Sequence, residues 1–231
     1  MSKLTNVITI GMMIGAVAGC KSTTAVTQEL AFNEQSEMRP KSEIAKINAQ
    51  LGIAYLEQKN VQRAKQKLLI ALEQGPGIPE TWYSMAYFLE ATGNKAEARK
   101  YYMKSVAIAP QRGDAQNNFG TFLCRSGEYR ESIKHFMLAV KAPDYLDPAA
   151  AYENAGQCSM KMHAYKQAAN YFNQALLKDP ARTSSLLKLA EADVKLGNYS
   201  HAREMLLQYS LVSPPTTKSK NLNDQLVKMS G

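Results

Sequence analysis

Small and apolar residues recur along most of this chain at a spacing of about 34 residues. A series of small residues, each able to let two helices approach closely, runs through Gly52, Ala86, Gly120, Gly156 and Ala190. An apolar residue precedes each member of the series: Leu51, Met85, Phe119, Ala155 and Leu189. The pattern predicts that each period begins with an amphipathic helix that packs closely against a neighbour.

A second helical stretch follows in each period. Twelve residues after the first series come Ala64, Ala98, Ser132, Ala168 and Ala202, and four residues further come Leu68, Tyr102, Phe136, Phe172 and Leu206. Three residues beyond these lie Ala71, Ser105, Ala139 and Ala175, with Tyr209 as the exception. Between the two stretches stand Gly93, Gly127 and Gly197, where glycine predicts a left-handed helix cap, with Lys59 and His163 in the other two periods. A proline closes each period: Pro76, Pro110, Pro143, Pro180 and Pro214.

This pattern resembles the tetratricopeptide repeat. The resemblance implies an all-α fold, a right-handed superhelical solenoid of about five repeats with a short C-terminal cap, because one helix pair cannot bury its own apolar face. We expect the repeat domain over residues 41–214, in units at about 45–78, 79–112, 113–148, 149–182 and 183–214. Residues 215–231 are expected to form a cap or tail, with a short helix around Asn221 to Lys228. The alternative is an unrelated helical bundle with accidental periodicity.

The N-terminus has the features of an export signal. Lys3 precedes a mostly apolar stretch from Val7 to Val17, which is too short to span a bilayer as a mature helix. The ending Val17-Ala18-Gly19-Cys20 resembles the lipobox of bacterial lipoproteins, so residues 1–19 would be removed and Cys20 would be lipidated. The alternative is an ordinary secretory signal that leaves Cys20 as a spare thiol.

The residues after Cys20 suggest a destination. Position 21 is Lys and not Asp, which by the sorting rule of such lipoproteins resembles an outer-membrane address facing the periplasm. Residues 20–40 are rich in Ser, Thr, Gln and Glu and end at Pro40, so we expect a flexible tether of roughly 25 Å root-mean-square length.

Composition excludes several classes of protein. The 231 residues are 45% hydrophobic and 21% charged, which argues against a collagen, a disordered tail and a multi-span membrane protein. The net charge of +8 is compatible with acidic surfaces, anionic lipid or nucleic acid, and establishes none of them. We expect no nucleic-acid partner, because the basic residues alternate with acids and an exported lipoprotein rarely meets nucleic acid.

The sequence contains no catalytic pattern. His135, His163 and His201 fall in different repeats, and none belongs to a set of Cys, His and acidic residues with the spacing of a metal site. There is no Gly-rich phosphate loop, and no pair of carboxylates of the kind that glycan cleavage needs. We therefore expect no enzyme, no metal site, no cofactor and no small-molecule substrate.

In the tetratricopeptide fold the first helices line a concave surface that binds a peptide. Residues four apart on a helix share a face, so the aligned positions form stripes across the array. The candidates for this protein-binding groove are Tyr83, Tyr87, Asn117, Thr121, Arg125, Glu153, Gln157, Lys161, Glu191 and Lys195. For any one of them, an exposed helix residue without a partner is an equally good interpretation.

Two cysteines remain once Cys20 is assigned to the lipid. Cys124 and Cys158 lie in the first helices of adjacent units, and export would place them in an oxidising compartment. A disulfide between them would close a loop of about 34 residues and stabilise the fold by roughly 3–4 kcal/mol. The alternative is a pair of buried, reduced thiols that pack as small hydrophobes.

The middle of the chain carries a more specific resemblance. The run from Gly113 to Cys124 reads GDAQNNFGTFLC, residues 143–148 read PDYLDP, and residues 153–158 read ENAGQC. With the lipobox and a two-residue insertion before the fourth unit, the chain resembles the type IV pilus biogenesis and stability lipoproteins, the PilW/PilF family. The paired cysteines match positions where this family would carry a bridge. The short C-terminus departs from the family, since a sixth full repeat is not evident.

The resemblance implies an outer-membrane pilotin. Such a protein would bind the type IV pilus secretin through its groove and promote its localisation or multimerisation in the outer membrane. Its lipid would hold the scaffold at the membrane while the groove raises the local concentration of secretin subunits. An alternative with the same anchor and fold is a scaffold for β-barrel assembly or for peptidoglycan enzymes.

Overall fold

The computed structural model describes residues 40–229, and the chain from Lys41 forms one compact unit that contains the whole of the described core. Its helices are α2 (Lys41–Glu57), α3 (Val61–Gln74), α4 (Pro79–Ala91), α5 (Lys95–Ile108), α6 (Gly113–Arg125), α7 (Tyr129–Lys141), α8 (Pro148–Lys161), α9 (Tyr165–Lys178), α10 (Thr183–Leu196), α11 (Tyr199–Val212) and α12 (Thr217–Lys228). The predicted signal segment 1–19, Cys20 and the predicted tether up to residue 39 lie outside the described residues.

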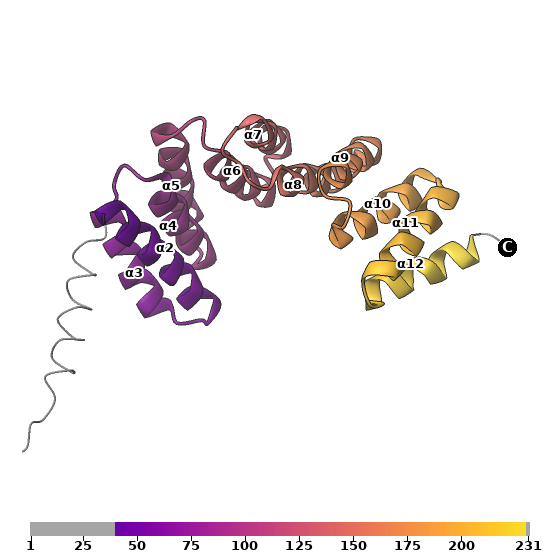
Figure 1. Cartoon of the computed structure of the whole chain (residues 1–231), viewed down its shortest axis with the longest axis horizontal. Coiled ribbons are helices and arrows are strands. Elements are labelled where there is room, and N and C mark those ends of the chain that lie inside the picture. The colour runs from indigo at the N-terminus through magenta and orange to yellow at the C-terminus, as the bar shows by residue number, and fades with distance from the viewer. Residues whose placement is uncertain (1–39, 230–231) are drawn as a thin grey trace, which may run out of the picture. The chain divides into compact units, whose positions relative to one another are not determined.

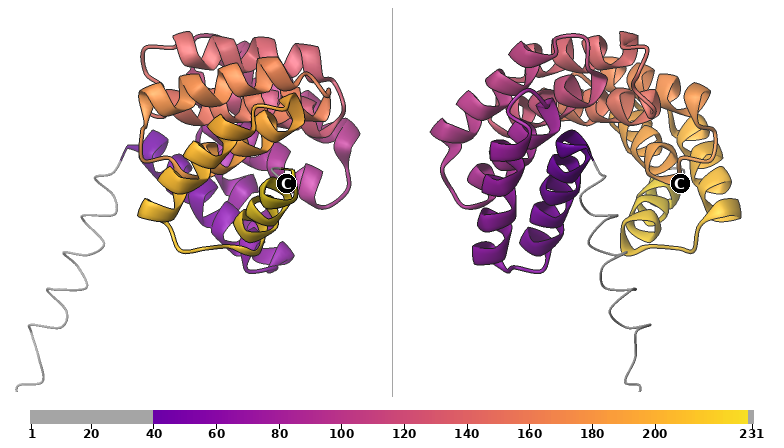
Figure 2. Two further views of the ribbon diagram at one scale, coloured as in Figure 1. Left: turned by 90° about the vertical axis from the view of Figure 1, so that its right-hand side faces the viewer. Right: turned by 60° about the vertical axis from the view of Figure 1, so that its left-hand side comes forward.

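Consecutive helices form antiparallel pairs, from α2 and α3 to α10 and α11, and the pairs follow one another in chain order (Figures 1 and 2). Each second helix contacts the first helix of the next pair. The first helices also contact one another in succession, from α2 and α4 to α8 and α10. The predicted all-α array of helix pairs is therefore confirmed, and the first helices form a continuous layer.

Small residues lie where the two helices of a pair cross, as the 34-residue series predicts. A Cβ atom added to Gly52 would lie 2.5 Å from the Leu68 side chain, and one added to Gly156 would lie 2.5 Å from Phe172. Leu68 and Phe172 are fully buried in the same pairs. A larger residue in place of either glycine would push these core side chains out of position.

The turns inside the pairs use the left-handed backbone conformation that the glycines predict. Gly93, Gly127 and Gly197 all have positive φ. Lys59 and His163 take the same conformation, with φ of 61° and 57°. A residue with a Cβ atom pays roughly 1–2 kcal/mol there, so the surrounding repeats hold these two turns in place.

The C-terminal end of the array is packed differently from the repeats in its interior. Tyr209 occupies a position that is Ala or Ser in the other units, and it is buried on α11 near α12. Helix α12 starts at Thr217, four residues before the expected helix, because Thr216 and Ser219 form a reciprocal capping box. Leu222 and Leu226 of α12 are buried against α10 and α11. Helix α12 alone therefore covers the apolar face of the last helix pair.

Within residues 40–229, no helix combines the length and the apolar character needed to cross a bilayer.

Candidate protein-binding face

The ten predicted groove residues all lie on the layer of first helices. They come from α4, α6, α8 and α10, and within each helix they are spaced by about one turn. The structure uses several of them to join one repeat to the next, and leaves others exposed.

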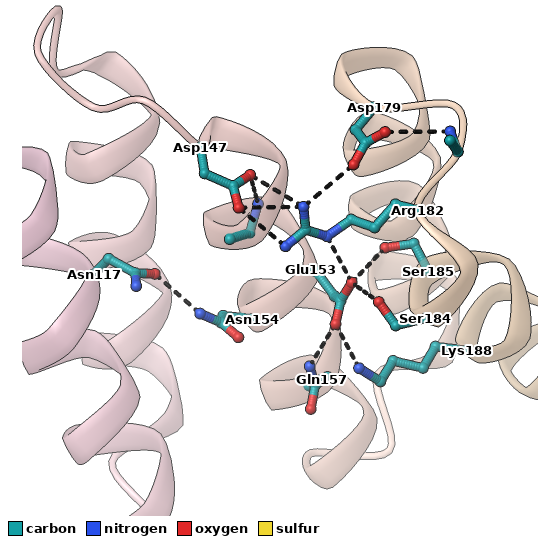
Figure 3. A network of polar contacts seen from close by, with 12 residues as sticks. Asn117, Asp147, Glu153, Asn154, Gln157, Asp179, Arg182, Ser184, Ser185 and Lys188 are labelled. Carbon is teal, nitrogen blue, oxygen red and sulfur yellow. Dashed lines mark hydrogen bonds and ion pairs between the residues drawn. The ribbon is translucent and has the colours of Figure 1, made fainter. Parts of the chain in front are cut away.

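Glu153 of α8 belongs to the first group and is the centre of a polar network (Figure 3). Its carboxylate accepts hydrogen bonds from Arg182 Nε at 2.9 Å, Lys188 Nζ at 2.6 Å and Ser185 Oγ at 2.8 Å. Ser184 and Gln157 also donate to it. With only 7% of the residue exposed, Glu153 fastens α8 to α10 and has no free carboxylate for a partner.

The network fixes the charge of Glu153. Burial by itself raises the pKa of a carboxyl group, but hydrogen bonds from Lys188, Ser184 and Ser185 outweigh burial and lower the pKa of Glu153 to about 2. The carboxylate is therefore ionised at any physiological pH. Its negative charge lies against the two cations Arg182 and Lys188 at the junction between the fourth and fifth repeats.

Arginines that directly precede first helices form a related set of contacts. Arg182, just before α10, also pairs with Asp147 at 3.1 Å. Seventy residues earlier, Arg112 just before α6 pairs with Glu80 at 3.1 Å and with Asp144 at 2.7 Å. In the third and fifth repeats, the arginine just before the first helix therefore forms ion pairs with carboxylates of neighbouring elements.

Two predicted groove residues of α6 are also engaged between repeats. Arg125 makes a bidentate pair with Glu90 of α4, at 2.7 Å and 2.6 Å. Asn117 accepts a hydrogen bond from the side chain of Asn154 on α8 at 3.0 Å (Figure 3), and its carbonyl accepts one from Thr121. These contacts run along the layer of first helices from α4 to α8.

The two tyrosines of α4 have different environments. Tyr83 is partly buried, and burial with the nearby carboxylates of Asp114 and Glu80 raises its pKa well above the usual range. Tyr87, one turn later, is 40% exposed and presents an aromatic ring to solvent. Tyrosine is frequent among the anchor residues of protein interfaces, so Tyr87 is the stronger candidate of the two.

Helix α12 covers part of the last predicted stripe. Lys218 of α12 pairs with Glu191 at 2.6 Å, and an adjoining cleft of about 200 Å³ is lined by Glu191, Lys195 and Leu222, among others. Glu191 is therefore held by the cap, whereas Lys195 stays exposed. Lys161 is exposed as well, and Arg125 is exposed but paired with Glu90. The exposed candidates outside the contacts between repeats are therefore Tyr87, Lys161 and Lys195, with Thr121 and Gln157 partly exposed beside them.

Sequence reasoning missed the partners of these residues, namely Glu90, Asn154, Arg182, Lys188 and Lys218. A signal for some of them is present in the chain. Glu90 and Arg125, Asp147 and Arg182, and Glu153 and Lys188 are each separated by 35 residues, which is one repeat plus one position. Opposite charges at that spacing indicate contacts between neighbouring repeats.

Cys124 of α6 and Cys158 of α8 are joined as a disulfide in the structure, with Cα atoms 5.8 Å apart. Both residues are buried and pack with Phe136 and Ala155. The pair lies at the junction between the third and fourth repeats, which the hydrogen bond between Asn117 and Asn154 also joins.

No three His, Cys, Asp or Glu side chains come together as a possible metal site in the part of the chain that the structure describes. The histidines are separate, and each has its own neighbour. His135 contacts Gln116, His163 contacts Tyr165, and His201 contacts Asp193.

Two tetratricopeptide repeat family models match the chain, one over residues 50–113 and one over residues 159–222. The chain belongs to the tetratricopeptide repeat family. Proteins of this family are typically non-catalytic scaffolds for protein–protein interaction. The predicted repeat solenoid is thereby confirmed by sequence as well as by structure.

Individual relatives narrow this assignment. An uncharacterised protein of Haemophilus influenzae is 31% identical over 145 residues, covering 62% of this chain and 81% of the relative. The type IV pilus assembly protein PilF of Pseudomonas aeruginosa is 27% identical over 180 residues, covering 78% of this chain and 71% of PilF.

Solved structures agree with this relationship. A structure of Pseudomonas aeruginosa PilF has a TM-score of 0.74 at 26% identity, covering 83% of this chain and 86% of PilF. The crystal structure of PilW, described as a widely conserved type IV pilus biogenesis factor, has a TM-score of 0.72 at 24% identity, covering 80% of this chain and 85% of PilW. The chain is thus a homologue of PilF and shares the fold of PilW.

Proposed function

We propose that this protein is an outer-membrane lipoprotein that binds the secretin of the type IV pilus and promotes its localisation or multimerisation. The relationship to PilF, a type IV pilus assembly protein, over 78% of the chain carries the proposal. The lipobox that ends at Cys20 supports the location, since a lipidated Cys20 followed by Lys21 matches an outer-membrane address facing the periplasm.

The secretin segment would bind along the layer of first helices. Tyr87 offers an exposed aromatic ring on α4, Thr121 and Gln157 offer polar groups for a peptide backbone, and Lys161 and Lys195 offer positive charge farther along. The contacts between repeats made by Glu153, Arg125 and Asn117 hold this surface rigid. A rigid surface binds with less loss of conformational entropy than a flexible one.

The mechanism follows from tethering. A lipid on Cys20 would restrict the repeat domain to the membrane surface, within reach of the 20-residue segment that links them. Secretin subunits that bind the domain would then meet at a raised effective concentration at that surface. Export into an oxidising compartment would also keep Cys124 and Cys158 joined.

The experiment that tests this function compares cells with and without the gene. Inner and outer membranes are separated and blotted for the detergent-resistant secretin multimer. On deletion we expect the multimer to fall sharply or to remain in the inner membrane, while porins assemble normally, and a plasmid copy should restore it. A normal multimer in the outer membrane after deletion would overturn the proposal, and a porin defect would indicate a β-barrel assembly role.

A further inference from the structure

Basic residues gather at the edge of the array where the two helices of each pair are joined. This turn edge comprises the end of each first helix, the turn, and the start of the second helix: residues 57–62, 91–96, 125–130, 161–166 and 195–200. Its acidic residues are Glu57 and Glu128, and its basic residues are Lys59, Lys95, Arg125, Arg130, Lys161, Lys166 and Lys195.

Among the described residues, the carboxylates near this edge are paired with other cations, except that of the exposed Glu57. Glu128 forms an ion pair with Arg99, and Glu90 forms one with Arg125. Glu97 and Glu131 pair within their own helices with Lys100 and Lys134. Within residues 40–229, six exposed cations of the edge are left without an ion pair: Lys59, Lys95, Arg130, Lys161, Lys166 and Lys195.

Helix electrostatics does not account for three of these cations. Lys95 is the first residue of α5, and Arg130 and Lys166 are the second residues of α7 and α9. A helix N-terminus carries partial positive charge, so a cation there opposes the helix dipole. Since these positions do not help the fold, their charges point to a partner outside it.

Tyrosines accompany the cations from repeat to repeat. Tyr129, Tyr165 and Tyr199 are the first residues of α7, α9 and α11, and each is partly exposed. One open cleft of about 460 Å³ is lined by Tyr129, Arg130 and Met162, with Glu128 and Glu131, which pair with Arg99 and Lys134, also on its wall. In the next repeat, Tyr165, Lys166 and Leu196 occupy corresponding places around an open cleft of about 670 Å³.

The opposite edge, formed by the loops between pairs, lacks this excess of positive charge. Residues 73–80, 107–114, 140–149 and 177–184 hold Arg112, Lys141, Lys178 and Arg182 among the basic residues. Their acidic residues are more numerous: Glu73, Glu80, Asp114, Asp144, Asp147 and Asp179. Arg112 and Arg182 are moreover engaged by carboxylates. The two edges therefore differ in charge.

We propose that the turn edge lies against an anionic phospholipid membrane. The free cations outside the predicted groove are Lys59, Lys95, Arg130 and Lys166, which come from four successive repeats. They are not gathered into one pocket, which fits an extended anionic surface. Tyrosines suit the same boundary, because their rings are apolar and their hydroxyls remain hydrated. This contact goes beyond the proposed function, since it requires neither the lipid on Cys20 nor a secretin.

The test measures vesicle binding by residues 41–231, the compact unit without the lipid attachment site. Vesicles of phosphatidylglycerol and phosphatidylcholine are compared with vesicles of phosphatidylcholine alone by sedimentation. The edge variant combines Lys95→Gln, Arg130→Gln and Lys166→Gln, all outside the predicted groove. The control variant combines Lys141→Gln, Lys178→Gln and Lys220→Gln, which removes the same charge from exposed residues elsewhere.

The original unit should bind only the anionic vesicles. Each Lys or Arg at an anionic surface contributes about fivefold to partitioning, so the edge variant should bind roughly 100-fold more weakly. The control variant should lose less than about threefold, through net charge alone. Urea unfolding should show the edge variant to be as stable as the original or slightly more so, because the cations removed oppose helix dipoles.

Three results would overturn the inference: no binding to anionic vesicles, equal losses in the two variants, or binding to polyglutamate without binding to vesicles. The last of these would indicate an acidic protein partner. Failure here is distinguishable from failure of the proposed function. A lipidated protein that does not bind anionic vesicles through this edge can still assemble the secretin. The deletion experiment measures secretin assembly separately.

Discussion

Replacing Glu153 by glutamine is expected to lower the free energy of unfolding by about 3 kcal/mol at pH 7. The substitution keeps the size of the side chain and removes its charge. Arg182 and Lys188, at 2.9 Å and 2.6 Å from the carboxylate, would then lose the anion that they share at the junction of α8 and α10. Arg182 would keep its pair with Asp147, whereas Lys188 would lose the anion that balances its charge. The cost is large because the Glu153 side chain is only 10% exposed, so water does little to screen the two cations.

The effect should depend on pH with a definite sign. The pKa of Glu153 is lowered from 4.5 to about 2 in the folded protein, so the folded state favours the ionised form. The stabilisation is therefore fully present above about pH 4.5 and is lost as the pH falls toward 2. The difference in stability between the original protein and Glu153→Gln should shrink across this window.

Urea unfolding between pH 2 and pH 7 measures both the loss of stability in Glu153→Gln at pH 7 and the way this loss changes with pH. The matched control is Glu97→Gln, which removes a carboxylate from an exposed pair with Lys100 on α5 and should leave the free energy of unfolding nearly unchanged. Equal losses in Glu153→Gln and Glu97→Gln, or a loss that does not vary with pH, would contradict the structural role of the network.

Reducing the disulfide between Cys124 and Cys158 is expected to lower the free energy of unfolding by about 3–4 kcal/mol. The bridge joins residues 34 apart in sequence, and it restricts the unfolded chain by closing that loop. Because it connects α6 to α8, reduction should weaken the junction between the third and fourth repeats more than the other junctions.

The measurement is urea unfolding of residues 41–231 with and without dithiothreitol, since Cys124 and Cys158 are the only cysteines of this unit. The double variant Cys124→Ala with Cys158→Ala serves as the control and should be insensitive to the reductant. If the reductant leaves the original unit as stable as before, the two thiols are not joined in the purified protein.

The fold could be predicted from the sequence because the residues that specify it lie close together within each repeat and recur in every repeat. Glycines such as Gly52 and Gly156, twelve residues before a second small residue, mark each helix crossing, and the structure places Leu68 and Phe172 over them. The glycines of the turns predict the left-handed caps at Gly93, Gly127 and Gly197. Each repeat adds an independent match, so one irregular position does not obscure the period.

The candidate site could be predicted only in part. Helical spacing places the residues on the layer of first helices, but it does not show what each side chain meets one repeat away. Glu153 and Arg125 therefore look like free groove residues in the sequence, whereas the structure engages them with Lys188 and Glu90. Glu191 illustrates another limit, since its partner Lys218 belongs to a capping helix outside the repeat pattern.

The measurement that tests the central claim most directly is photo-crosslinking in living cells. A photoreactive amino acid replaces Tyr87, which is 40% exposed on the layer of first helices, or Met103, which is 51% exposed on the second helix α5. We expect an adduct with the secretin from position 87 and none from position 103, in cells that still assemble pili. Adducts of equal yield from both positions, or none from position 87, would contradict the claim that this face binds the secretin.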